Sequence, residues 1–287
     1  MTRFSTRLAL AICAVLASAC GAPENSSPPA AQILATTAHL AKSSPKLKAH
    51  FGAVAGGWSA DGQQTVSSAW LKAQAAKTKN PFLTRSSAPA FADGAWEIFR
   101  GQGDAVGIRL TPERAESRPL QLQDGHALYR GVFPATDAVL TADQTSSELA
   151  YLLHDASAPT SFSWHVQFGS AIANATLDNG GLRFVSAQGK ALMEMPQPIV
   201  VDSAGITRIA SLDWDAKQAR LTIKLDTHGL EFPVLLDPSV TTFVWTQVTT
   251  STAPPGTLRR IDGYPRRQGR PLWRSWSRHR LQRHLDF

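Results

Sequence analysis

The sequence predicts an all-β fold, an antiparallel sandwich or barrel-like module, with a short helical or linker region before it and an irregular tail after it. Apolar and polar side chains alternate along residues 162–168 and 221–225. A period of two buries one side of an extended strand. Turn sequences such as Asp178-Asn-Gly-Gly181 and Asp226-Thr-His-Gly229 separate the apolar stretches. Short strands joined by turns, with no long helix between them, favour an antiparallel sheet.

The first 19 residues have the pattern of a signal peptide. Two arginines precede an apolar stretch, Leu8–Leu16, that is too short to span a bilayer. Ala17-Ser18-Ala19 and Cys20 follow. This resembles a bacterial lipoprotein signal with its lipobox, which implies cleavage before Cys20 and lipidation of that cysteine. Ala17 departs from the leucine that is preferred there, and an ordinary secretory signal cut after Ala19 is the alternative.

The chain contains two cysteines, and Cys13 lies inside the segment that would be removed. The mature chain would therefore have no disulfide and no cysteine-based zinc site. Residues 20–32 are rich in proline and serine, so we expect a lipid-anchored flexible tether. Gly21, rather than aspartate, after the cysteine favours outer-membrane sorting by resemblance to enterobacterial rules.

Residues 33–94 are rich in Ala, Lys and Ser, and we expect them to be partly helical or linker. Apolar residues recur at helical spacing between Ile33 and Phe51, where Pro45 interrupts the pattern. A second short helix is expected over Trp70–Lys79. Residues 95–240 carry the all-β pattern, and about 140 residues suffice for one sizeable core.

Three segments of this module share a further resemblance. They are Tyr129-Arg-Gly-Val-Phe-Pro-Ala-Thr-Asp137, Glu148-Leu-Ala-Tyr-Leu-Leu-His-Asp155 and Val234-Leu-Leu-Asp-Pro238. Together they are similar to an all-β module that precedes β-propeller or Rhs-type repeats in secreted bacterial proteins. The resemblance implies no catalytic residues. It implies that residues 241–257, with Trp245–Pro255, begin a first kelch-like blade.

The tail, residues 258–287, has nine arginines, no lysine and two acidic residues, and it holds the whole formal net charge of +7. The tail can be back-translated into DNA with CGN codons for arginine and then translated again one nucleotide downstream. In that shifted frame the codons permit the sequence RVVLFGG over residues 268–275 and the sequence YNDTWT over Leu281–Asp286. These strings resemble a blade of a kelch-type propeller, so we expect a frameshift just after Pro255. A native basic tail that binds polyanions is the alternative, although the exported N-terminus argues against nucleic acid as a partner.

Few polar groups suggest a chemical site. Asp213 and Asp215 could form half of a divalent-metal site, but aspartate is also a common turn residue. His154-Asp155 and His165 could form an acid–base pair if their strands are neighbours; a solvated position is the alternative for His165. His126 and His228 are expected to be exposed.

Aromatic side chains offer one more hypothesis. Trp58, Trp70 and Trp96 could line a carbohydrate platform, and core burial is the alternative. Phe162, Trp164 and Phe168 share one strand face and are expected in the core. No serine-hydrolase elbow, zinc-protease motif, P-loop or dinucleotide-binding motif occurs in the sequence.

The sequence thus predicts a lipid-anchored envelope protein of the outer membrane, or alternatively a secreted one. Its β module would be the non-catalytic part of a truncated kelch-repeat propeller protein with an interaction or adhesion role. We expect no cofactor, no metal and no catalytic residue; Cys20 is the one predicted modification site. The expected partners are the membrane, through the anchor, and an unidentified protein or glycan. The alternatives are an envelope enzyme that acts on glycans and polyanion binding through the arginine-rich tail.

Overall fold

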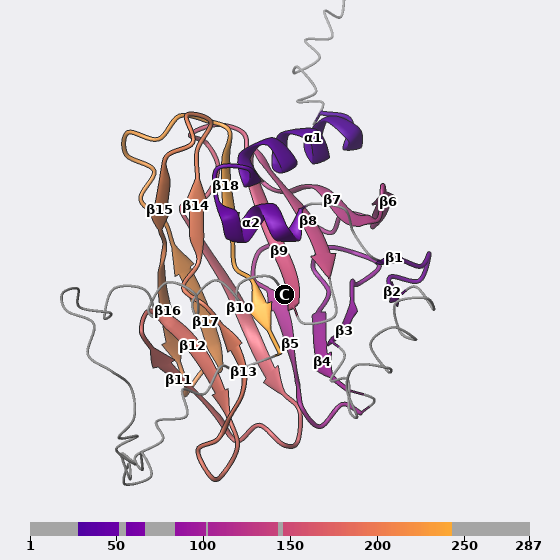
Figure 1. Cartoon of the computed structure of the whole chain (residues 1–287), viewed down its shortest axis with the longest axis vertical. Coiled ribbons are helices and arrows are strands. Elements are labelled where there is room, and N and C mark those ends of the chain that lie inside the picture. The colour runs from indigo at the N-terminus through magenta and orange to yellow at the C-terminus, as the bar shows by residue number, and fades with distance from the viewer. Residues whose placement is uncertain (1–27, 52–55, 67–83, 102, 143–145, 243–287) are drawn as a thin grey trace, which may run out of the picture. The chain divides into compact units, whose positions relative to one another are not determined.

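A computed structural model describes residues 28–51, 56–66, 84–101, 103–142 and 146–242. Within these ranges the chain is predominantly antiparallel β-sheet, which confirms the predicted all-β class. Two sheets face each other across a core, and two helices cover the outer face of the larger sheet (Figure 1). The prediction of a sandwich-like module is therefore correct.

Two helices open the described chain, α1 over Ala30–Ala41 and α2 over Pro45–His50. Ala30 to Gln32 were expected in the tether, and that prediction is wrong: alanine favours helix, and α1 begins directly after Pro29. Pro45 separates the two helices as expected, because the residue before a proline is disfavoured in a helix and proline itself is tolerated at the first helical position.

The six-stranded sheet has the order β16-β17-β10-β5-β4-β3. Its strands are β3 (Thr84–Ser87), β4 (Trp96–Arg100), β5 (Gly107–Pro112), β10 (Ser161–Phe168), β16 (Ser211–Asp215) and β17 (Arg220–Lys224). The predicted alternation is confirmed in β10, where Phe162, Trp164 and Val166 are buried and His165 is exposed. One side of this sheet therefore faces the core and the other faces solvent.

The larger sheet is built around β9 (Ser146–Leu153). Along one edge, β9 pairs with β8 (Thr136–Ala142), which continues to β7 (His126–Phe133) and β6 (Gln121–Gln123). Along its other edge β9 has two partners, so the sheet forks there. Residues 151–153 of β9 pair with β18 (Val234–Asp237), and residues 146–147 pair with β19 (Val240–Thr241). The Asp237-Pro238 step lies at this fork.

The two limbs of the fork contain the remaining strands of the larger sheet. β18 continues to β14 (Ile199–Val201) and β15 (Thr207–Ile209). β19 continues to β13 (Ala191–Met195), β12 (Gly181–Val185) and β11 (Asn174–Asp178). Asn179 and Gly180 both have positive φ in the β11–β12 hairpin, as its Asn-Gly turn predicts.

The region expected to be partly helical or linker also contains strands. β1 (Gly56–Trp58) and β2 (Gln64–Val66) form a two-stranded sheet, and β3 joins the six-stranded sheet. Strands of three or four residues are too short to give a clear period of two, so the sequence pattern did not reveal them. The expected helix at Trp70–Lys79 lies outside the described residues.

The core between the sheets is rich in aromatic side chains. Phe162 is 1% exposed, and its ring centroid lies 4.7 Å from that of Tyr151 and 5.3 Å from that of Phe133. A second apolar cluster lies on the outer face of the larger sheet, where Leu152 and Leu235 pack under Ile33 and Leu47 of the helices. Strands β8 and β9 are therefore buried on both faces.

Candidate functional site

The outer face of the six-stranded sheet, called the open face below, is a polar surface. Its side chains alternate with those of the core and come from β16, β17, β10, β5 and β4. No described helix or strand packs over it. The exposed or half-buried residues on this face include Asp213, Asp215, Arg220, Thr222, Lys224, Ser163, His165, Gln167, Arg109, Thr111 and Glu97.

The arginines of the open face are paired with acids. Arg220 binds Glu113, with its Nε 3.0 and 3.1 Å from the two carboxylate oxygens, and also donates to Ser163 Oγ at 3.2 Å. Ser163 Oγ in turn lies 3.0 Å from Thr222 Oγ1. This network spans three elements and holds several hydrogen-bonding groups in fixed positions.

A second set of pairs lies at the β3–β4–β5 side of the open face. Arg109 Nε donates to Glu97 at 2.6 Å, and Arg85 pairs with Asp104. The two guanidinium groups also lie 4.9 and 5.0 Å from the ring centroid of Phe99, which is 4% exposed. Cation–π contact and ion pairing thus order these arginines together.

Asp137 forms a deeply buried contact with His154. Its Oδ2 lies 2.7 Å from His154 Nε2, and its Oδ1 accepts a hydrogen bond from Gly131 N at 2.7 Å. The Asp137 side chain is 1% exposed and that of His154 25%. Gly131 has φ of 63° where the β7–β8 register shifts, so the carboxylate holds a β-bulge in place.

This arrangement explains two of the three segments behind the resemblance. The Tyr129–Asp137 segment is the end of β7, the bulge, a tight turn and the start of β8. His154 follows β9 and also donates its backbone N–H to Ala135 O at 2.8 Å. The segments therefore form a local structural unit in which Asp137 and His154 join the turn to β9.

The histidines predicted as a possible acid–base pair do not meet. His154 follows β9 in the larger sheet, whereas His165 lies on the open face of the other sheet. Asp155, next to His154, accepts hydrogen bonds from the Ser157 hydroxyl and backbone, which lower the pKa of its carboxyl group. The pairing hypothesis is therefore wrong, and His154 has Asp137 as its partner instead.

His228 is exposed as expected, but His126 is not. The His126 ring is half-buried and stacks on Phe51 beside α2, with centroids 6.3 Å apart and planes 4° apart. Desolvation lowers the pKa of His126, although a hydrogen bond from its ring to Asp124 O partly opposes this effect. The prediction failed because the glycine beside His126 suggested a turn, whereas His126 begins β7 under the helical layer.

The depressed pKa of His126 predicts loss of stability in acid. The unfolded chain binds a proton near the ordinary pKa of 6.5 while the folded chain keeps the neutral ring, so stability falls as the pH drops below that value. We expect the urea midpoint to fall between about pH 7.5 and about pH 5.5, and to fall less in His126→Gln. Equal losses in both proteins, measured by tryptophan fluorescence, would contradict this role of His126.

The possible metal and carbohydrate sites are not supported. Asp213 and Asp215 are exposed on β16, and Asp215 Oδ1 accepts hydrogen bonds from Lys217 N and Gln218 N, as in a turn. Across the described ranges, no group of three potential metal ligands occurs. Trp96 is 4% exposed and Trp58 packs against the core, so neither presents a sugar platform; Trp70 lies outside the described residues.

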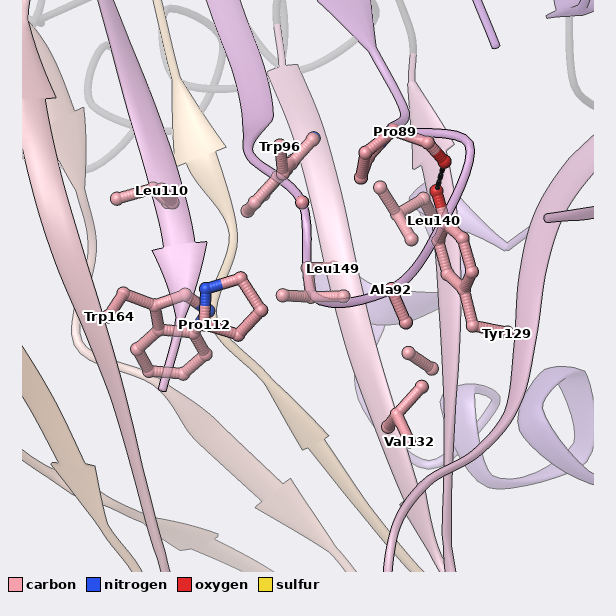
Figure 2. A pocket seen from close by; sticks show the side chains of 12 residues that line it. Pro89, Ala92, Trp96, Leu110, Pro112, Tyr129, Val132, Leu140, Leu149 and Trp164 are labelled. Atoms are coloured by element: carbon pink, nitrogen blue, oxygen red, sulfur yellow. Dashed lines mark hydrogen bonds between the residues drawn. The ribbon is translucent and has the colours of Figure 1, made fainter. Parts of the chain in front are cut away.

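Described residues of the sandwich line a small cavity (Figure 2). It has a volume of about 30 Å³, and apolar side chains such as Trp164, Leu140 and Val132 line it. Tyr129 borders it and donates its hydroxyl to Pro89 O, and burial raises the pKa of that hydroxyl. A cavity of this size has room for about two water molecules, so it is a packing gap and not a substrate pocket.

Two buried carboxylates share the outer face of the larger sheet. Glu148 in β9 is 1% exposed and Asp237 in β18 is 0% exposed. The register of β9 with β18 places both on the side that carries Leu152 and Leu235. Glycosidases use two carboxylates that reach the sugar from a cleft. These two side chains are engaged in contacts and closed to solvent, so they do not favour a glycan hydrolase.

The predicted lipidation site, Cys20, and the tail at 258–287 lie outside the described residues. Of the expected first blade at 241–257, Thr241 belongs to β19 and pairs with β13 and β9, so it is part of the module. In the part of the chain that the structure describes, no helix is both long and apolar enough to cross a bilayer. Comparisons with known protein families, curated proteins and solved structures found no match to this chain.

Proposed function

We propose that this protein is a lipid-anchored component of the bacterial cell envelope, at the outer membrane, and that its β module has a non-catalytic interaction or adhesion role. The open face is the observation that carries the interaction role. Helices cover one outer face of the sandwich, while the other presents ordered polar groups to solvent. Fixed hydrogen-bonding groups on a rigid sheet are suited to contact a protein or glycan without further ordering cost.

The charge of the open face favours such a partner over a polyanion. Arg85, Arg109 and Arg220 each have a carboxylate partner, so their charges are locally neutralised. Strong attraction to a polyanion requires a cluster of uncompensated cations. Polyanion binding would therefore depend on the arginine-rich tail, and it would be salt-sensitive and lost on truncation after Pro255.

Lipid anchoring is tested by metabolic labelling with a radioactive fatty acid. We expect the wild-type protein to incorporate the label and Cys20→Ala to incorporate none, because Cys20 is the only thiol in the proposed mature chain. Cys13→Ala is the matched control and should retain full labelling, since Cys13 lies in the removed segment. Equal incorporation after Cys20→Ala, or none in the wild type, would exclude the anchor.

We further propose that the β module belongs to a longer kelch-repeat propeller protein whose reading frame is shifted just after Pro255. Resequencing the gene from codon 250 onward, and translating the shifted frame, is the direct test. The string RVVLFGG followed by further blades would assign the function to a longer propeller protein. An unbroken frame with no blade sequence downstream would instead make the arginine-rich tail native and polyanion binding the leading function.

A further inference from the structure

The helical layer on the larger sheet is a locally basic surface. Residues 28–51 contain three lysines and two histidines but no aspartate or glutamate. Lys42, directly after α1, and Lys48, in α2, are both exposed. The excess of +7 resides in residues 258–287, so residues 1–257 sum to zero, and the part of them outside residues 28–51 is net negative, at −3. The positive charge of this layer is therefore a property of the surface and not of the overall composition.

Exposed isoleucines lie beside this basic layer. The turn between β14 and β15 contacts the α1–α2 connection, where a Cβ on Gly205 would come within 3.1 Å of Ser43 Oγ. Ile206 in this turn is 44% exposed, and Ile209 in β15 is 65% exposed. Both the turn and α1 lie at the upper end of the molecule in Figure 1.

The strand register places one isoleucine on the same side as the helices. Ile209 pairs with Ile199, which packs against the apolar cluster under α1 and α2. Ile209 therefore extends this apolar strip past the helices to the edge strand, where it is open to solvent. Lys42, Lys48, Ile206 and Ile209 together form what we call the helix-side surface.

We propose that the helix-side surface rests on the anionic headgroups of the bilayer in which Cys20 is anchored. This inference rests on the proposed function, because the anchor selects the bilayer as the occupant. Nine residues, Gly21–Pro29, separate Cys20 from α1. They keep the start of α1 within about 35 Å of the membrane even when fully extended. The helical layer is thus the first described element after the proposed anchor.

The composition of the surface matches a membrane interface. Apolar side chains that flank a basic helical surface enter the headgroup region, while lysines remain among anionic lipids. The open face belongs to the other layer of the sandwich and has balanced charges. With the helix-side surface on the bilayer, the open face points away from it and stays accessible to a partner.

The test uses the full chain acylated at Cys20 and reconstituted in vesicles that contain phosphatidylglycerol and a nitroxide-labelled lipid. A fluorophore is attached to Thr207→Cys, an exposed position between the two isoleucines, or to Gln167→Cys on the open face. No other free thiol remains in the proposed mature chain. We expect strong quenching at position 207 and little at 167. Equal quenching at both positions overturns the inference.

Charge reversal supplies a second readout. Lys42→Glu with Lys48→Glu should lower the surface-bound population by at least about thirtyfold, because each lysine near anionic lipid contributes about 1 kcal/mol and tenfold corresponds to about 1.4 kcal/mol. Quenching at position 207 should fall with it. Quenching of the protein without the charge reversals should also fall in vesicles of phosphatidylcholine alone, which carry no net charge. Unchanged quenching overturns the inference. Mass spectrometry separates the failure of this inference from the failure of the proposed anchor. An acylated chain that shows no quenching at position 207 rejects only the membrane contact. A chain that is purified from its own cells and carries no acyl group rejects the proposed anchor.

Discussion

Replacement of Phe162 by alanine is expected to lower the free energy of unfolding by about 4 kcal/mol, the loss typical of a large buried aromatic side chain. The Phe162 ring is 1% exposed and lies between Tyr151 and Phe133, so its removal leaves a cavity between the sheets. Rings on both sides would lose their contacts, and neither sheet can close the gap without distortion. Urea unfolding followed by tryptophan fluorescence measures the change.

The matched control is the same substitution at an exposed phenylalanine. Phe91 is 52% exposed, and Phe91→Ala should change stability by less than about 0.5 kcal/mol. Similar losses in Phe162→Ala and Phe91→Ala would mean that the aromatic contacts between the sheets do not stabilise the sandwich. The comparison separates loss of a core ring from a general effect of losing a phenylalanine.

Replacement of Asp137 by alanine is expected to destabilise the fold by about 3 kcal/mol, because it removes a buried charged acceptor and leaves its donors unpaired. Gly131 N and His154 Nε2 would both lose their partner. The bulge in β7 would then lose the contact that joins it to β8 and β9. The same urea titration measures this loss.

Asp137→Asn tests the assignment more finely. The amide oxygen can still accept from Gly131 N, so this variant should lose clearly less stability than Asp137→Ala. Asp213→Ala, at an exposed position on β16, should leave the unfolding midpoint unchanged. If Asp137→Ala unfolds at the same urea concentration as Asp213→Ala, the buried pair contributes nothing to stability.

The strands with one solvated face were predictable from the sequence, whereas those buried on both faces were not. β10 and β17 alternate between core and open face, so their period of two is visible in the residues. Every residue of β8 and β9 is buried, since the sandwich core lies on one side and largely the helices on the other. Without a polar face these strands carry no alternation.

The contacts of the candidate sites depend on strand register, which the sequence pattern does not contain. Arg220 and Glu113 are separated by 107 residues and meet only because β17 pairs with β10 and β10 with β5. Asp137 and His154 are closer in the chain but need the β8–β9 register and a bulge. The polar sides of β10 and β17 were the signal for the open face.

The fork beside β9 has a consequence for the order in which the fold can be assembled. β9 ends at Leu153, but its partners on one edge, β18 and β19, lie at residues 234–237 and 240–241. A growing chain therefore carries an unpaired edge on its central strand until the end of the module has been synthesised. Such long-range pairing slows folding and exposes that edge to aggregation in the meantime. The Asp-Pro step at the fork thus marks the point in the chain after which the larger sheet can close.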